Sequence, residues 1–194
     1  MNRVARSIAE TCIVKGDVTL SSGRQSTRYY DVKRWLMQEG DHGNAAWVGN
    51  AILQSLCDGE WLGDIDHKDL RLVFLELGGV LMMPGFEYNP ALAHPPLFWS
   101  VLRKERQDHG MESLWINQPP VGAKVVLLDD VATTGGSLVR AVGVCHAAGL
   151  EVLAAVVVVD RLEGAEDLLS HCRVPLFSLC TGAELLQAQG EELK

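Results

Sequence analysis

Residues 125–137 read Val-Val-Leu-Leu-Asp-Asp-Val-Ala-Thr-Thr-Gly-Gly-Ser, and this stretch decides the fold. Val125–Leu128 is an apolar run typical of a strand buried on both faces of a sheet. From Ser137 to Ala148 apolar residues recur at helical spacing, and Gly149 is a suitable C-terminal stop. A buried strand that leads through a short loop into a helix predicts an α/β sheet with parallel connections.

The same pattern continues outward from this stretch. Further strands are predicted at four apolar runs: Leu72–Leu75, Leu97–Leu102, Leu153–Val159 and Pro175–Leu179. The first part of the chain predicts a helix over Arg3–Val14 ended by Gly16, extended runs at Val18–Leu20 and Arg28–Val32, and a helix over Gly43–Leu56. We interpret residues 1–194 as a single domain with a mostly parallel open sheet flanked by helices and a small N-terminal elaboration. Ligands bind such sheets beyond the carboxyl ends of the strands.

Composition narrows the class of protein. The 194 residues are 47% hydrophobic and 22% charged, which suits a folded domain with its own core. The longest apolar run, Leu153–Val159, is far short of the ~20 residues of a membrane-spanning helix. The first ten residues lack the apolar core of a signal peptide, so a soluble, cytoplasmic protein is expected. A net charge of −8 argues against general binding to nucleic acid or membranes.

The loop after the central strand can hold a phosphate group. Gly135 and Gly136 can adopt backbone angles that other residues avoid, and the following helix offers unpaired N–H groups. Hydroxyls come from Thr133, Thr134 and Ser137, while the carboxylates of Asp129 and Asp130 can accept hydrogen bonds from a ribose. The residues predicted to bind ribose 5-phosphate are therefore Asp129, Asp130, Val131, Ala132, Thr133, Thr134, Gly135, Gly136 and Ser137. The alternative is an ordinary turn before a capped helix.

The positively charged residues of this acidic chain are concentrated in a few short segments. One window holds Arg24, Arg28, Lys33 and Arg34, another holds Arg103, Lys104 and Arg106, and Arg161 follows a predicted strand. Such clusters supply the cations for an anionic ligand or form solvated faces.

Three further stretches complete a resemblance to a known family. Residues 16–31 read Gly-Asp-Val-Thr-Leu-Ser-Ser-Gly-Arg-Gln-Ser-Thr-Arg-Tyr-Tyr-Asp, residues 76–80 read Glu-Leu-Gly-Gly-Val, and residues 103–110 read Arg-Lys-Glu-Arg-Gln-Asp-His-Gly. The stretch 125–137 resembles the phosphoribosyl pyrophosphate signature of type I phosphoribosyltransferases. The other three resemble the N-terminal segment, the pyrophosphate loop and the mobile catalytic loop of orotate phosphoribosyltransferases. The resemblance implies the type I phosphoribosyltransferase fold, with a hood mainly over residues 1–35 and a mobile loop at about 103–117.

This resemblance implies a reaction. Orotate displaces pyrophosphate from phosphoribosyl pyrophosphate to give orotidine 5'-monophosphate in pyrimidine synthesis. This displacement needs cations beside the departing pyrophosphate and exclusion of water. The implied catalytic residues are Arg103, Lys104, His109, Asp129 and Asp130. The implied pyrophosphate-binding residues are Glu76, Leu77, Gly78, Gly79, Arg103, Lys104, Gln107 and His109. Mg²⁺ is the implied cofactor, carried by the pyrophosphate without a direct protein ligand and bridged by water to Asp129 or Asp130.

The resemblance also implies how the base is bound. The guanidinium of Arg161 matches the carboxylate of orotate in bidentate geometry, and the alternative is a surface salt bridge with Asp160 or Glu163. The implied orotate-binding residues are Arg161, Thr133, Ser21, Tyr29 and Tyr30. In this family the mobile loop reaches into the neighbouring subunit, which implies a homodimer with shared active sites.

One position departs from the family. Gln107 stands where the family's loop usually carries a lysine that contacts pyrophosphate. The difference predicts a slow enzyme and leaves two alternatives open. One is a weakly active paralogue or an enzyme for a different base, and the other is a nucleotide-sensing regulatory protein on the same fold.

Overall fold

The computed structural model describes residues 2–19, 25–38, 44–57, 61, 70–87, 98–105 and 113–190. Within these ranges the centre is a six-stranded sheet in the order β5-β4-β3-β6-β7-β8. All neighbouring strands are parallel except the edge pair β4 and β5. The strands are β3 (Leu70–Leu75), β4 (Phe98–Leu102), β5 (Trp115–Ile116), β6 (Lys124–Ala132), β7 (Glu151–Asp160) and β8 (Leu176–Thr181).

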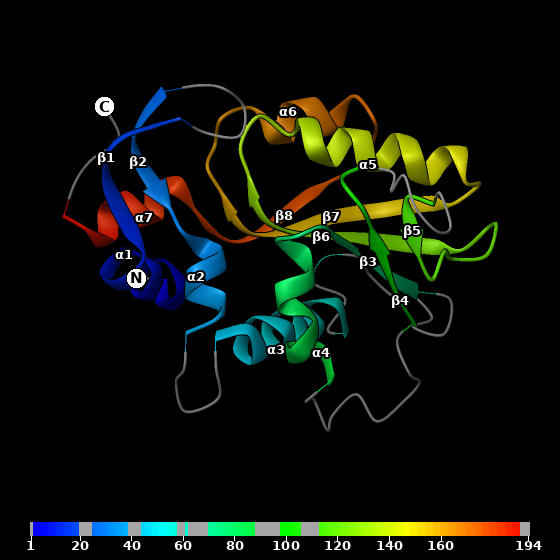
Figure 1. Cartoon of the computed structure of the whole chain (residues 1–194), viewed down its shortest axis with the longest axis horizontal. Coiled ribbons are helices and arrows are strands. Elements are labelled where there is room, and N and C mark those ends of the chain that lie inside the picture. Colours follow the sequence, from blue (N-terminus) through cyan, green and yellow to red (C-terminus); the bar gives the residue numbers. More distant parts are fainter. Residues whose placement is uncertain are drawn as a thin grey trace.

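Helices cover both faces of the sheet (Figure 1). One face carries α5 (Gly136–Ala147) and α6 (Ala165–Ser170). The other carries α2 (Val32–Leu36), α3 (Asn44–Cys57), the 3₁₀ turn η1 (Gly79–Met82) and α4 (Met83–Glu87). At the β8 edge, α1 (Arg3–Thr11) packs on α7 (Gly182–Ala188). None of the helices in the described ranges is both long and apolar enough to span a bilayer.

The predicted α/β fold with a mostly parallel sheet flanked by helices is confirmed. Each apolar run predicted as a strand overlaps an observed strand of the sheet. The predicted runs are largely apolar because helices cover both faces of the sheet, and Leu72, Leu127 and Val157 are all buried.

The N-terminal predictions need correction. The first helix ends at Thr11 rather than Val14, because Ile13 already begins the hairpin strand β1 (Ile13–Thr19), which pairs with β2 (Gln25–Tyr30). Gly16 does not end a helix. It lies inside β1 at φ +142°, where the pairing register shifts, so its conformational freedom serves a bulge.

A second correction concerns Val32, which was predicted at the end of an extended run. It is instead the first residue of α2. Asp31 begins this helix by accepting a hydrogen bond from the backbone N–H of Arg34 at 3.0 Å. This short helix is important for the site because it directs Lys33 toward β6.

Candidate active site

A large cavity lies at the carboxyl ends of the central strands. It has a volume of about 1130 Å³ and is lined by residues 75–78 after β3, 102–105 after β4, 129–138 at the end of β6, and Arg161 after β7. The hood contributes Val18, Tyr29, Tyr30 and Lys33. This position is where an open α/β sheet binds its ligands.

The acidic pair belongs to the central strand itself. Asp129 and Asp130 lie within β6, which continues to Ala132, whereas the sequence pattern placed them after the strand. Asp129 pairs in register with Val157 of β7, so the backbone of the pair is fixed by the sheet. Its carboxylate accepts a hydrogen bond from the backbone N–H of Asp130 at 2.9 Å. Burial and the neighbouring charge of Asp130 raise the pKa of the Asp129 carboxyl well above its ordinary value.

Lys33 supplies a cation to this pair from the hood. Its Nζ lies 2.8 Å from Oδ2 of Asp130. Partial burial lowers the pKa of the Lys33 ammonium, but the charges of Asp130, Tyr29 and Asp129 outweigh this effect and leave the pKa raised. The sequence placed Lys33 only in a basic cluster, because nothing local predicts a contact between α2 and the central strand.

The loop predicted to bind phosphate has one of its two glycines in an unusual conformation. Gly135 adopts φ +83°, a left-handed conformation, and a Cβ there would lie 2.9 Å from Cα of Ala165. Gly136 opens α5 with nothing within 4 Å of its Cβ position, so the helix N-terminus is accessible from the cavity. The loop residues Thr133, Thr134 and Ser137 line the same cavity. The arrangement can bind one phosphate group through hydroxyls and backbone N–H groups.

The loop after β3 approaches the acidic pair closely. A Cβ on Gly78 would overlap Oδ1 of Asp130, and a Cβ on Gly79 would overlap the carbonyl oxygen of Leu128. The Glu76–Leu77 peptide bond is cis. The Glu76 carboxylate accepts a hydrogen bond from the backbone N–H of Lys104 at 3.2 Å, which joins this loop to the segment after β4. The predicted pyrophosphate loop and the first cations of the predicted catalytic loop are therefore neighbours.

The segment after β4 begins the predicted mobile loop. Backbone bonding continues past the strand, since the N–H of Arg103 donates to the carbonyl of Leu114 at 2.8 Å. The Arg103 guanidinium donates to the carbonyl of Ser113 at 3.3 Å. Arg140 on α5 donates to the carbonyl of Arg103 at 3.2 Å and lines the cavity, a site contribution that sequence reasoning missed. Arg106, Gln107 and His109 lie outside the described residues, as does Ser21 of the hood.

Arg161 lies where the sequence predicts it, beyond β7. Its Nη2 is 2.8 Å from Oε1 of Glu163, and its guanidinium lies over the ring of Tyr30 at 5.3 Å from the centroid. Of the two alternative partners considered from the sequence, the ion pair forms with Glu163. Asp160 instead accepts a hydrogen bond from the backbone N–H of Leu162 at 2.9 Å. The Arg161 side chain is only 11% exposed, so it is directed into the cavity wall rather than into solvent.

The described residues contain no cluster of three or more His, Cys, Asp or Glu side chains that could hold a metal ion. The carboxylates that line the cavity are Glu76, Glu105, Asp129 and Asp130. Carboxylate oxygens are hard ligands that suit Mg²⁺, which usually retains waters and substrate phosphate oxygens in its shell. The donor set therefore fits a magnesium ion held jointly with a phosphorylated ligand.

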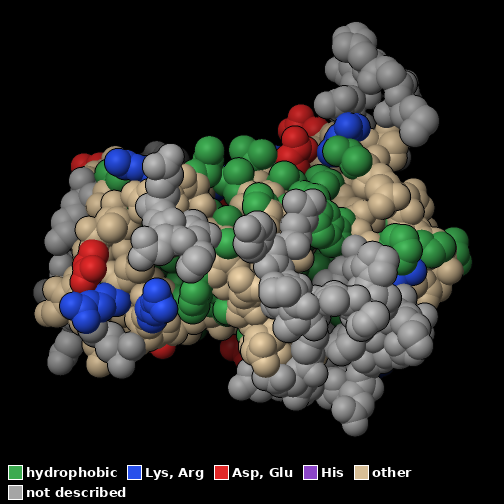
Figure 2. Space-filling model, turned by 90° about the horizontal axis from the view of Figure 1, so that it is seen from below, with side chains coloured by type: hydrophobic (Ala, Val, Ile, Leu, Met, Phe, Trp, Pro, Cys, Tyr) green, Lys and Arg blue, Asp and Glu red, His purple; other side chains and the backbone are tan. Residues whose placement is uncertain are grey.

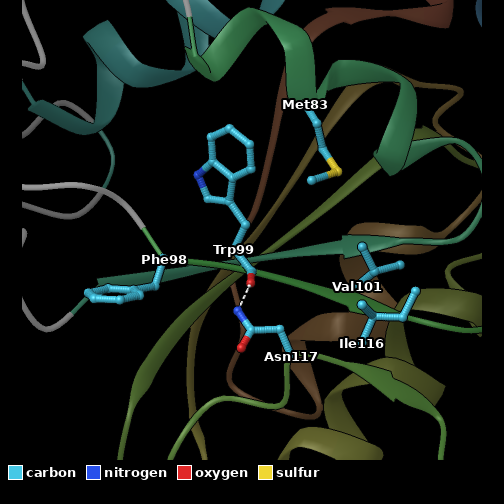
Figure 3. A pocket seen from close by; sticks show the side chains of 6 residues that line it. All are labelled: Met83, Phe98, Trp99, Val101, Ile116 and Asn117. Atoms are coloured by element: carbon cyan, nitrogen blue, oxygen red, sulfur yellow. Dashed lines mark hydrogen bonds between the residues drawn. The ribbon is translucent and has the colours of Figure 1, made fainter.

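A second cavity of about 440 Å³ lies at the antiparallel edge of the sheet (Figure 3). It is lined by Met83, Phe98, Trp99, Val101, Ile116 and Asn117. Asn117 donates to the carbonyl of Trp99 at 2.6 Å, and Val101 pairs with Ile116 on the neighbouring strand. Phe98 and Ile116 are 53% and 48% exposed. Figure 2 shows hydrophobic side chains exposed in the middle of the face on the side of α3 and α4.

Comparison with known proteins identifies relatives of the whole chain. Residues 115–178 match the Phosphoribosyl transferase domain. The orotate phosphoribosyltransferase of Methanopyrus kandleri is 36% identical over 94% of this chain and 90% of its own length. That of Aeropyrum pernix is 34% identical over 92% of this chain and 88% of its own length.

Solved structures agree with these relatives. The orotate phosphoribosyltransferase of Mycobacterium tuberculosis, in complex with 5-phospho-alpha-D-ribosyl 1-diphosphate, superposes with a TM-score of 0.69 at 26% identity. The superposition covers 95% of this chain and 97% of that one. With relatives more than 30% identical over nearly its full length, and with this fold and site, the chain belongs to the orotate phosphoribosyltransferase family of type I phosphoribosyltransferases.

Proposed function

We propose that this protein transfers ribose 5-phosphate from phosphoribosyl pyrophosphate to orotate, giving orotidine 5'-monophosphate and pyrophosphate in pyrimidine synthesis. One observation carries the proposal. The acidic pair and the phosphate loop form a continuous wall at the end of β6, and the cations Arg103 and Lys104 line the same cavity. The proposal assigns the ribose hydroxyls to Asp129 and Asp130, and the 5-phosphate to residues 131–137.

The proposed reaction separates charge in its transition state. As the bond from the anomeric carbon to pyrophosphate breaks, positive charge develops on the sugar and negative charge on the leaving group. Carboxylates beside the sugar and cations beside the pyrophosphate are then more favourable in the transition state than in the ground state. Arg103 and Lys104 take the pyrophosphate, as do Gln107 and His109 of the same loop. Glu76, Leu77, Gly78 and Gly79 form the facing loop.

The same proposal includes Mg²⁺ and the position of the base. Bound together with pyrophosphate, Mg²⁺ would neutralise part of the leaving group's charge, with water between the ion and Asp129 or Asp130. Arg161 binds the orotate carboxylate. The other residues assigned to orotate are Thr133, Tyr29, Tyr30 and Ser21. The contact of Arg161 with the Tyr30 ring supports this assignment, because it directs the guanidinium toward the hood side of the cavity.

The test of this function is a steady-state assay with phosphoribosyl pyrophosphate and Mg²⁺ against four bases: orotate, uracil, hypoxanthine and adenine. Turnover of orotate alone is expected. Preference for another base would reassign the substrate. Turnover of none of the four, with binding of phosphoribosyl pyrophosphate retained, would favour the nucleotide-sensing alternative.

A double variant, Asp129→Asn with Asp130→Asn, tests the ribose site directly. The amides preserve shape and remove charge, so phosphoribosyl pyrophosphate should bind at least about tenfold more weakly in calorimetry. Circular dichroism checks that the fold is retained. Unchanged affinity in a folded double variant would contradict the assignment.

A homodimer with shared sites is part of the proposal. The exposed Phe98 and Ile116 beside the smaller cavity offer an apolar surface for such a contact. Mixing the inactive His109→Ala chain with the inactive double asparagine chain should restore about a quarter of wild-type activity. Half of randomly paired dimers would then contain one intact site built from both chains. If each site is complete within one chain, mixing restores nothing.

A further inference from the structure

The ion pair between Lys33 and Asp130 crosses between the hood and the central strand. The Lys33 side chain is 42% exposed, whereas that of Asp130 is 8% exposed. One partner is therefore fixed in the sheet, and the other is a flexible side chain at the cavity wall. If the pair separates, Lys33 is the partner that moves.

Asp130 has limited room for a second partner. Its Oδ1 lies against Gly78, where even a Cβ would overlap it. Its Oδ2 is the oxygen that meets the Lys33 ammonium. A ribose hydroxyl that donates to Asp130 thus approaches the side that Lys33 holds, and the two donors share or exchange this oxygen.

The surroundings of Lys33 indicate where its charge can go. Helix α2 packs against both β6 and the η1 turn, which begins at Gly79, the last residue of the proposed pyrophosphate loop. The Lys33 ammonium contacts Oδ2 of Asp130, whose Oδ1 lies against Gly78, so it is close to both the sugar side and the pyrophosphate side of the cavity. A multiply charged diphosphate at Gly78 and Gly79 is the strongest anion it could meet after leaving Asp130.

We propose that Lys33 is a cation with two positions, bound to Asp130 before the ribose arrives and to the diphosphate group once a ribose hydroxyl takes Asp130. This inference rests on the proposed function, because it assumes a ligand that carries both a ribose and a diphosphate. According to this inference, Lys33 makes binding of the diphosphate depend on whether the ribose site is occupied. The hood thereby takes part in binding the diphosphate as well as in covering the base.

The test compares three probes by calorimetry: ribose 5-phosphate, inorganic pyrophosphate with Mg²⁺, and phosphoribosyl pyrophosphate with Mg²⁺. In Lys33→Met, phosphoribosyl pyrophosphate should bind at least about tenfold more weakly, since a charge-assisted contact is lost. Inorganic pyrophosphate carries no ribose to take Asp130, so its affinity should change by less than about twofold. Ribose 5-phosphate should bind equally well or more tightly, because its competitor for Asp130 is gone. Lys33→Arg should restore most of the affinity for phosphoribosyl pyrophosphate.

Arg34→Met is the matched control, because it removes the same charge from an exposed neighbour on the same helix. It should change each affinity by less than about twofold. Lys33→Gln repeats the measurement with a polar replacement in case Lys33→Met folds poorly.

Three outcomes would overturn the proposal, two of them in the variant and one in the wild type. Equal weakening of all three probes in Lys33→Met would mean that Lys33 only anchors the hood, and no change with any probe would mean a surface ion pair. A wild-type protein that binds pyrophosphate but fails to use orotate would count against the proposed function and leave the Lys33 comparison intact. A wild-type protein that binds neither diphosphate ligand would overturn both.

Discussion

Gly49 of α3 and Gly85 of α4 are in backbone contact, so that a Cβ on Gly49 would overlap the carbonyl carbon of Gly85. The two helices cross at this point on the face of the sheet that leads to the Gly78 loop. The close approach requires glycine for reasons of space, because neither residue has a positive φ.

Gly49→Ala should therefore lower the free energy of unfolding by about 1–3 kcal/mol through overpacking. Urea denaturation monitored by circular dichroism measures this change. Gly143→Ala is the control, since Gly143 is exposed in α5 with nothing within 4 Å of its Cβ position. That variant should gain about 0.4–1 kcal/mol, and equal effects of the two substitutions would refute the packing argument.

The raised pKa of Asp129 predicts a pH-dependent cost of keeping this carboxyl in the strand. As pH rises above the ordinary value of about 4, the unfolded chain loses the proton before the folded chain does, so stability falls with increasing pH. Asp129→Asn should therefore unfold at a higher temperature than wild type at pH 7, and the gain should vanish near pH 4. A pH-independent change in melting temperature would show that packing, not ionisation, is responsible.

Arg161→Ala should discriminate between the two substrates. Loss of a charge-assisted contact is worth about 1.5–3 kcal/mol, or about 10- to 150-fold in affinity for orotate. Affinity for phosphoribosyl pyrophosphate should change by less than about threefold, because Arg161 is assigned to the base. Parallel weakening of both substrates would indicate that its 2.8 Å ion pair with Glu163 has a structural role only.

Gln107→Lys tests the departure from the family's loop pattern. If this position faces the departing pyrophosphate, a lysine would add a charge-assisted hydrogen bond worth about 1.5–3 kcal/mol in the transition state. We expect kcat for orotate to rise by about tenfold or more. An unchanged kcat together with loss of activity in Arg106→Ala would mean that Arg106 provides this contact instead. Unchanged rates in both variants would indicate that product release limits turnover.

The parts of the structure that were predictable from sequence have strong local signals. The continuous apolar runs locate the strands because both faces of the sheet are covered, and Gly135 marks a loop with a left-handed backbone conformation. Gly16 misled the prediction, since a glycine at a β-bulge and one at a helix end look alike in sequence.

The site contacts that were not predictable are tertiary. Lys33 meets Asp130 because a five-residue helix of the hood packs against the central strand, a contact without periodicity in the sequence. Arg140 occupies an exposed position of α5, where an arginine is ordinarily a solvated residue. Its bond to the Arg103 carbonyl depends on how the segment after β4 approaches the helix.

The place of Asp129 and Asp130 in β6 separates the cavity into a permanent and an adjustable part. Strand β6 pairs with β3 as far as Leu128 and with β7 through Asp129, so amide hydrogen exchange around the acidic pair should be slow. The cations come from the hood, from α5 and from the segments after β4 and β7. Substitutions in these outer segments could therefore change base preference and turnover among members of the family, while the same central strand continues to bind the sugar.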